Sequence, residues 1–358
     1  MIRRKRDGQQ GDGETPEHHR PGGGFRNPWR EYAPDVPQGF FAWARAHRTT
    51  YPRPVDPHPS VFRRALPEFP SPREHADVLT ITWVGHATFL IQIGGLNILT
   101  DPVWSDRLSP MPFAGPRRWV PPGVELESLP PIDIVLVSHN HYDHFDTRSV
   151  KRLATLHPGA HWFTPLELGA HVQREGARLV QELDWWSQAR VGPVTVTCTP
   201  AQHWSARGLR DRGSSLWCGY ALRTESRAIY FAGDTAYFPG FREIAERLGP
   251  LDIALLPIGG YEPRWFMKFV HMNPEDAVRA FTELSGTGEK TKMVPMHWGT
   301  FKLTDEAMDE PPRRLLAAWQ EAKLSDDRLW IPAHGESRSI PPSSQADDIA
   351  GPSAIRSQ

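Results

Sequence analysis

The stretch SHNHYDHFD at 138–146 limits the fold of this chain more than any other feature. It follows the apolar run IDIVLV, which is typical of a β-strand buried on both faces. Its polar side chains therefore emerge at the carboxyl end of a strand, where α/β sheets tend to place their chemistry. His139 and His141, two apart in extended backbone, project to one side and can share an ion. Asp143 and His144 lie past the turn, so this one loop can supply imidazole and carboxylate ligands to two zinc ions.

Three more candidate ligands each follow an apolar run elsewhere in the chain. His203 comes after VTVTCTPAQ, Asp234 ends AIYFAGD, and His297 ends KMVPMH. One such residue alone is usually structural, but four strand ends that all deliver ligand-type residues predict a shared site.

Strand and helix patterns alternate along the chain after a β-rich start. Strands are predicted at 79–85, 88–95, 96–103, 132–139, 192–200, 220–234 and 251–259, and helices at 147–156, 165–176, 240–248, 274–285 and 311–322. Gly94-Gly95 marks a hairpin turn, and Asn273-Pro274 is an N-cap followed by proline at the first helical position. The pattern is that of an α/β protein, and a four-layer αββα arrangement of two sheets with outer helices fits it.

The spacing His139-x-His141-x-Asp143-His144, with Asp234 in a GDT turn, resembles the metallo-β-lactamase superfamily. The resemblance is most specific to the family of N-acylphosphatidylethanolamine-hydrolysing phospholipases D. It extends from FRNPW near the N-terminus to HGESR and includes ITWVGHATFLIQIGGLNILTDPVWSDRLSP, GPRRW, LPPIDIVLVSHNHYDHFD, GDTAYFPGF, WFMKFVHMNPEDAV and MHWGTF.

This resemblance implies an αββα sandwich of the metallo-β-lactamase type with two zinc ions (Zn²⁺) as cofactors. The implied ligands are His139, His141 and His203 for one ion, Asp143, His144 and His297 for the other, and Asp234 as the bridge between them. A hydroxide held between two such ions would attack the phosphodiester. Asp143 and His271 are the expected catalytic residues, with His271 orienting the phosphate or donating a proton. The alternative for His271 is a plain helix-entry position.

Further residues are candidates for supporting roles. His86 in GHAT and His334 in HGE are expected either to orient ligands or to pack in the core, and Asp101 in LTDP is expected to support a ligand histidine. Trp265, Phe266 and Phe269 would line a groove for an acyl chain and touch a membrane surface, or they would simply pack under a loop.

The implied function is that of a zinc-dependent phosphoric diester hydrolase of the phospholipase D type. Its substrate would be an N-acylphosphatidylethanolamine-like lipid, cut to phosphatidate and an N-acylethanolamine. Neither a GxSxG elbow nor a catalytic cysteine pattern competes for the role of nucleophile. Two alternatives stay open: a hydrolase of this fold that acts on a lactone or a nucleic acid, and a zinc-bound protein without turnover.

Composition adds expectations about compartment and partners. The formal net charge of -1 offers no overall basic field, so nucleic acid is not expected as a partner. Cys198 and Cys218 cannot form a disulfide framework, and we expect buried thiols in a reducing compartment. No secretory signal or apolar run of membrane-spanning length is evident, so we expect a cytoplasmic protein with peripheral membrane contact. The sequence leaves open whether the chain forms a homodimer.

Four segments are predicted along the chain. Residues 1–24 are expected to be disordered, 25–75 to form an aromatic and proline-rich arm that packs on the core, 76–340 to form the catalytic domain, and 341–358 to be a disordered tail. For the second segment, a proline-rich linker is the alternative.

Overall fold

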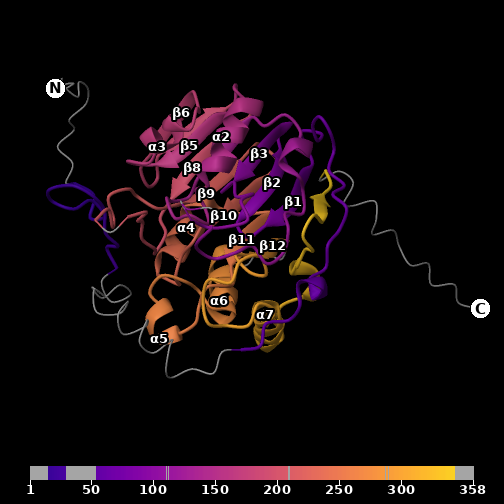
Figure 1. Ribbon diagram of the computed structural model, residues 1–358. Helices are drawn as coiled ribbons and strands as arrows, with labels where there is room; N and C mark the ends of the chain where they lie inside the picture. Colours follow the sequence, from indigo (N-terminus) through magenta and orange to yellow (C-terminus); the bar gives the residue numbers. More distant parts are fainter. Residues whose placement is uncertain are drawn as a thin grey trace, which may run out of the picture.

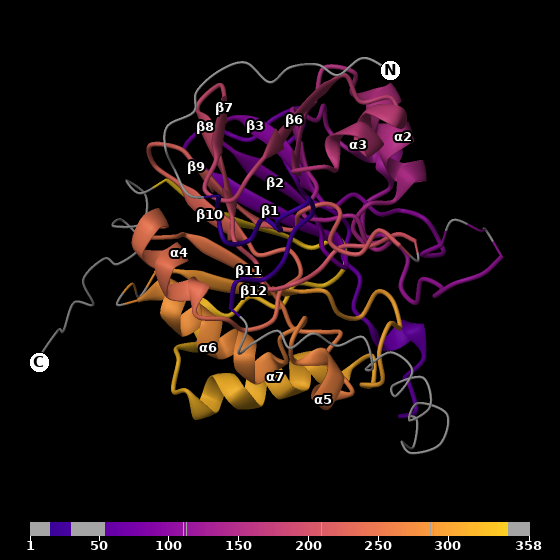
Figure 2. The ribbon, with the colours of Figure 1, turned by 90° about the vertical axis from the view of Figure 1, so that its left-hand side faces the viewer.

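The protein forms two β-sheets that pack face to face between layers of helices (Figure 1). The structure is a computed structural model that describes residues 15–29 and 54–342, except 110, 112, 209, 287 and 289. Figure 2 shows α2 and α3 outside one sheet and α4, α6 and α7 outside the other. The predicted four-layer αββα architecture is thus confirmed.

The first sheet has seven strands in the order β13-β1-β2-β3-β4-β5-β6. Its strands are β1 (Leu79–Gly85), β2 (Thr88–Ile93), β3 (Leu96–Thr100), β4 (Ile134–Leu136), β5 (His161–Pro165), β6 (Leu179–Leu183) and β13 (Ser337–Ile340). The pairs from β13 to β3 are antiparallel, and those from β3 to β6 are parallel.

The second sheet has six strands in the order β12-β11-β10-β9-β8-β7. Its strands are β7 (Gln188–Val191), β8 (Val194–Thr199), β9 (Gly219–Arg223), β10 (Ala228–Phe231), β11 (Ile253–Pro257) and β12 (Lys292–Met296). β10, β11 and β12 are parallel, so the carboxyl ends of these three strands meet at one edge.

The helices cover the outer faces of the sheets, and two of them begin with side-chain caps that the sequence contains. The α-helices are α2 (Thr147–Leu156), α3 (Gly169–Arg174), α4 (Gly240–Leu248), α5 (Arg264–Met267), α6 (Pro274–Ser285) and α7 (Glu310–Glu321). The short 3-10 turns are η2 (Pro59–Val61), η3 (Leu126–Ser128) and η4 (Asp326–Arg328). The side chain of Asp146 accepts from the backbone N–H of Arg148, and that of Asn273 accepts from Asp276. Among the described residues, no helix combines the length and apolar character needed to cross a bilayer.

The two largest clusters of buried apolar side chains lie on either side of the first sheet. The larger lies between the sheets and contains fully buried residues such as Trp83, Tyr220 and Phe231. The smaller lies between the first sheet and its helices and includes Val135 and Trp162. β4 is thus buried on both faces, as its apolar sequence predicts.

Some strand predictions differ from the structure. The run 220–234 contains two strands, β9 and β10, because the backbone reverses where Thr224 N–H donates to the carbonyl of Arg227 at 2.9 Å. β6 and β7 were not predicted, since their side chains are largely exposed and polar and show no apolar run.

Residues 15–29 lie against the domain formed by the two sheets, within and just after the segment expected to be disordered. His18 and Phe25 are buried there. The expected arm at 25–75 includes residues 30–53, and with them Tyr32, Phe40, Phe41 and Trp43, which lie outside the described part of the chain. The same holds for residues 1–14 and for 343–358 of the expected tail.

Candidate metal centre

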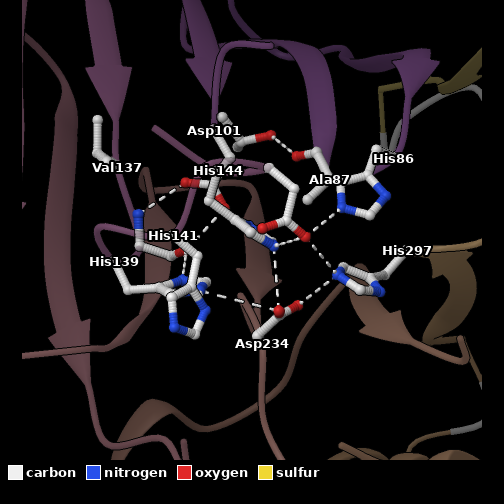
Figure 3. Close-up of polar contacts among 12 residues, drawn as sticks. His86, Ala87, Asp101, Val137, His139, His141, His144, Asp234 and His297 are labelled. Carbon is white, nitrogen blue, oxygen red and sulfur yellow. Dashed lines mark hydrogen bonds and ion pairs between the residues drawn. The ribbon is translucent and has the colours of Figure 1, made fainter. Parts of the chain in front are cut away.

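All seven predicted ligands come together at one edge of the two sheets. Figure 3 labels five of them, His139, His141, His144, Asp234 and His297. The loop after β4 supplies His139, His141, Asp143 and His144, and segments after β8, β10 and β12 supply His203, Asp234 and His297. Backbone of unusual conformation positions part of this edge. Asp101 and His297 have φ values of 31° and 63°, in the left-handed region of the Ramachandran plot. Residues other than glycine keep this conformation only where the surrounding structure holds them in it.

The first group of candidate ligands consists of His139, His141, His203 and Asp234. The Nε2 atom of His139 lies 2.9 Å and that of His203 lies 3.2 Å from Nδ1 of His141. Three imidazole nitrogens that point at one another in this way suit a tetrahedral cation, with the carboxylate as a further ligand.

The second group consists of His86, Asp143, His144 and His297, whose ligand-type atoms lie within 4.8 Å of one another. The Oδ2 atom of Asp143 lies 3.0 Å from Nε2 of His86, 3.3 Å from Nε2 of His297 and 3.4 Å from Nε2 of His144. His86 thus contacts a candidate ligand directly, which fits the first of the two roles expected for it, the orientation of a ligand.

Asp234 lies between the two groups, and Figure 3 shows it between His139 and His297. Its Oδ2 atom is 3.0 Å from Nε2 of His144 and 3.7 Å from Nε2 of His203. Its Oδ1 atom is 3.2 Å from Nε2 of His297. One carboxylate therefore faces both groups at once.

The chemistry of these side chains fits two divalent cations. The Nε2 atoms of His144 and His297 and the Oδ1 atom of Asp234 are buried, and none makes a hydrogen bond of acceptable geometry. Buried polar atoms of this kind are costly unless something compensates them. The set contains only imidazole nitrogens and carboxylate oxygens, which are ligands for zinc and for several other transition metals.

Burial keeps the first group of imidazoles neutral. It lowers the pKa of His203 to about 3 and that of His141 to about 4, and it lowers the pKa of His139 well below its usual value. Neutral imidazole is the form that binds a metal.

Two imidazoles of the second group, His144 and His297, respond in the opposite way, whereas burial lowers the pKa of His86 to about 3. Burial opposes protonation of His297, but Asp234 and Asp143 outweigh it and raise the pKa to about 9. The same two carboxylates, with Asp101, raise the pKa of His144 well above its usual value against the effect of burial. The carboxylates thus attract positive charge to the nitrogens, and protons and metal ions compete for these atoms.

Hydrogen bonds to the ring nitrogens that face away from the centre orient two of the candidate ligands, His144 and His203. Asp101 accepts from Nδ1 of His144 at 2.7 Å, which leaves Nε2 free to face the centre. The same carboxylate accepts from the backbone N–H and hydroxyl of Ser138 at 2.7 and 2.6 Å. Nδ1 of His203 donates to the carbonyl of Val270 at 2.8 Å. Ser138 was not singled out from the sequence, although it directly precedes the first candidate ligand.

Replacement of Asp101 by alanine is expected to weaken the binding of the cation held by His144 by about 10–100-fold, because the imidazole loses the acceptor that orients it. Asp133→Asn is the matched control: Asp133 accepts from the backbone N–H of Asn97 at 2.8 Å where β3 begins, away from the centre. Competition with a chromogenic chelator measures the affinity. Equal losses in both variants would show that Asp101 acts only on general stability.

His271 lies beside the centre but outside its two main groups. Its Nε2 atom is 4.0 Å from Oδ2 of Asp234, and its ring centroid is 5.0 Å from that of His203. Burial lowers its pKa to about 3. Gly260 makes room for it, since a Cβ atom there would lie 3.1 Å from Nδ1 of His271.

The remaining candidates lie further from the centre. His334 packs on Trp83 and contacts the Thr300 hydroxyl at 3.0 Å, so it reaches the centre only through other residues. Trp265 and Phe266 lie on α5, and Phe269 follows it; the Trp265 side chain is 42% exposed, whereas the two phenylalanines are half-buried.

Comparisons with known proteins bear on the family and the fold of this chain. Residues 96–298 match the model of the β-lactamase superfamily domain. The chain is 43% identical over 248 residues to N-acyl-phosphatidylethanolamine-hydrolyzing phospholipase D 1 of Caenorhabditis elegans, a match that covers 66% of this chain and 68% of the relative. It is 36% identical over 264 residues to the mitochondrial N-acyl-phosphatidylethanolamine-hydrolyzing phospholipase D of Saccharomyces cerevisiae, which covers 71% of this chain and 54% of the relative. Among solved structures, isothiocyanate hydrolase from Delia radicum gut bacteria has a similar fold, with a TM-score of 0.57, 21% identity, and coverage of 74% of this chain and 99% of that one.

Proposed function

The chain belongs to the β-lactamase superfamily, and we propose that it is a metal-dependent phosphodiesterase of the phospholipase D type. Its substrate is an N-acylphosphatidylethanolamine-like lipid, and its products are phosphatidate and an N-acylethanolamine. The observation that carries the proposal is the pair of ligand groups joined by Asp234. The names of the relatives from Caenorhabditis elegans and Saccharomyces cerevisiae support the choice of substrate.

Two groups of side chains would hold the two zinc ions, and Asp234 would serve both. From the first group these would be His139, His141 and His203, and from the second Asp143, His144 and His297, with His86 beside Asp143. When bound, the ions supply Lewis acidity toward the phosphate and lower the pKa of the attacking water. Asp101 and Ser138 keep the imidazoles in the orientation that the ions require.

His271 is proposed to orient the phosphate. It lies at the border of the first and second groups, and its low pKa keeps the imidazole neutral near the phosphodiester. Its backbone is held in place: its N–H donates to the carbonyl of Met267 at 2.8 Å, and its own carbonyl accepts from Nη1 of Arg264 at 2.7 Å. A neutral ring with one N–H can donate a hydrogen bond to a phosphate oxygen. Protonation of the leaving alkoxide would need the imidazolium form, which burial disfavours here.

The segment that carries His271 is also proposed to meet the lipid. Its exposed Trp265, with Phe266 and Phe269 nearby, gives apolar surface for acyl chains, and Lys268 adds a positive charge next to it. An aromatic and basic surface of this kind suits peripheral contact with an anionic membrane.

The test is hydrolysis of N-acylphosphatidylethanolamine in mixed micelles, followed by mass spectrometry. The purified protein is expected to release N-acylethanolamine and phosphatidate in equal amounts, because water attacks phosphorus and the N-acylethanolamine leaves. Turnover of only a lactone or an oligonucleotide would redirect the same centre to another substrate. Full metal content without hydrolysis of the lipid, the lactone or the oligonucleotide would indicate a protein without turnover.

A further inference from the structure

The N-terminal segment 15–29 contacts the backbone that carries one of the candidate ligands. The Nδ2 atom of Asn27 donates to the backbone carbonyl of His203 at 2.8 Å, across 176 positions of the sequence. His203 is fully buried, and its imidazole is held on the other side by the carbonyl of Val270. The N-terminal segment therefore provides one of the contacts that position this ligand.

The orientation of the Asn27 amide is set by a second hydrogen bond. The indole Nε1 of Trp217 donates to Oδ1 of Asn27 at 3.1 Å, and the same N–H also donates to the carbonyl of Ala201 at 2.9 Å. The amide oxygen thus faces a donor, and its nitrogen faces the His203 carbonyl. An amide meets both requirements, whereas a carboxylate would lack the donor.

Other contacts fix the segment on the domain at both sides of Asn27. On one side, Nε2 of His18 and of His19 lie 2.7 and 2.8 Å from the two carboxylate oxygens of Asp184. On the other side, the Trp29 ring lies 4.5 Å from the ring of Phe238. Asn27 is thus flanked on both sides by contacts between the segment and the domain.

A turn at Gly24 brings the N-terminal segment into contact with the loop at Gly213. Phe25 N–H donates to the carbonyl of Gly213 at 2.7 Å. Gly24 has a φ of 77°, and a Cβ atom there would lie 2.6 Å from the Gly213 oxygen. Only glycine permits this close approach, which brings the segment onto the loop that follows His203.

We propose that Asn27 is a positioning residue of the metal centre and that it acts by holding the backbone of His203 through its carbonyl. This inference rests on the proposed function, because it requires His203 to bind a cation. Without the amide, the buried carbonyl loses its donor and the turn that carries His203 can shift. Metal sites respond to ligand shifts of a few tenths of an ångström.

The test compares zinc affinities of the full-length protein, measured by competition with a chromogenic chelator. Asn27→Ala is expected to weaken Zn²⁺ binding at the site that contains His203 about tenfold, the lower end of the effect of removing a group that orients a ligand. Asn27→Asp is the second variant, for use if Asn27→Ala does not fold. It retains the shape and the acceptor but lacks the donor, so the same loss of zinc affinity is expected. Phe25→Leu is the matched control, since it loosens the segment without touching His203; it should lower the melting temperature and leave zinc affinity within about twofold.

Two outcomes would overturn the proposal, and they differ from each other. If the wild-type protein binds zinc tightly and both Asn27 variants bind it equally well, Asn27 contributes only to folding, and the metal centre itself stands. If the wild-type protein binds no divalent cation, both the proposed function and the role of Asn27 fail.

Discussion

Asp234→Asn is expected to lower kcat/KM for the phosphodiester by at least about 10³-fold, or about 4 kcal/mol of transition-state stabilisation. Asp234 is the residue that both ligand groups share, with Oδ2 at 3.0 Å from Nε2 of His144 and Oδ1 at 3.2 Å from Nε2 of His297. An asparagine of nearly the same shape removes the negative charge and one of the two oxygen ligands. Neither cation would then keep its full ligand set.

The matched control for this substitution lies at the opposite end of the same strands. Asp252→Asn changes a carboxylate that accepts from the backbone N–H of Ala228 at 2.7 Å and pairs with Arg227. This variant should lose some stability and retain both metal and activity. Steady-state kinetics and metal analysis on the same preparations compare the two. If Asp234→Asn remained within about tenfold of the wild type, the shared carboxylate would have no essential role.

Removal of the metal is expected to abolish hydrolysis and to lower the melting temperature by about 6 °C. A ligand present at 1,000 times its dissociation constant stabilises the folded state by about 4 kcal/mol. The entropy of unfolding of a chain with about 300 ordered residues converts this free energy into a shift of that size. The carboxylates of Asp143 and Asp234 give the physical reason, because they attract positive charge strongly enough to raise the pKa of His297 to about 9 against the effect of burial.

This experiment uses a strong chelator followed by gel filtration, with differential scanning calorimetry and the lipid assay before and after addition of Zn²⁺. Activity and melting temperature should both return with zinc. The Asp234→Asn variant is the control for effects of the chelator itself, and its melting temperature should respond less. A chelated protein that keeps full activity would exclude any part for metal ions in the reaction.

Much of this centre could be predicted from the sequence because its ligands follow apolar strands. The fully buried β4 directly precedes the loop with His139 and His141. The strands β8, β10 and β12 end shortly before His203, Asp234 and His297. The spacing of apolar residues within a short segment is a local property, so a buried strand can be recognised in the sequence. Strands with exposed, polar side chains, such as β6 and β7, give no such signal.

Residues that act through long-range contacts could not be assigned in the same way. His86 lies in the turn between β1 and β2, and nothing local indicates that its Nε2 atom lies 3.0 Å from Asp143. Asn27 is 176 positions from the residue whose carbonyl it contacts. Such pairings depend on how the two sheets face each other, and this is a property of the complete fold.

The order in which the strands leave the ribosome has a consequence for how this protein matures. The loop after β4 is synthesised well before β12, and the first sheet closes only when β13 pairs with β1. A nascent chain therefore exposes His139 and His141 while His297 has yet to be made, and it cannot complete the second ligand group during translation. The first ligand group is complete once Asp234 has been made, whereas the second must wait for His297, so the two groups become available to metal ions at different stages of synthesis.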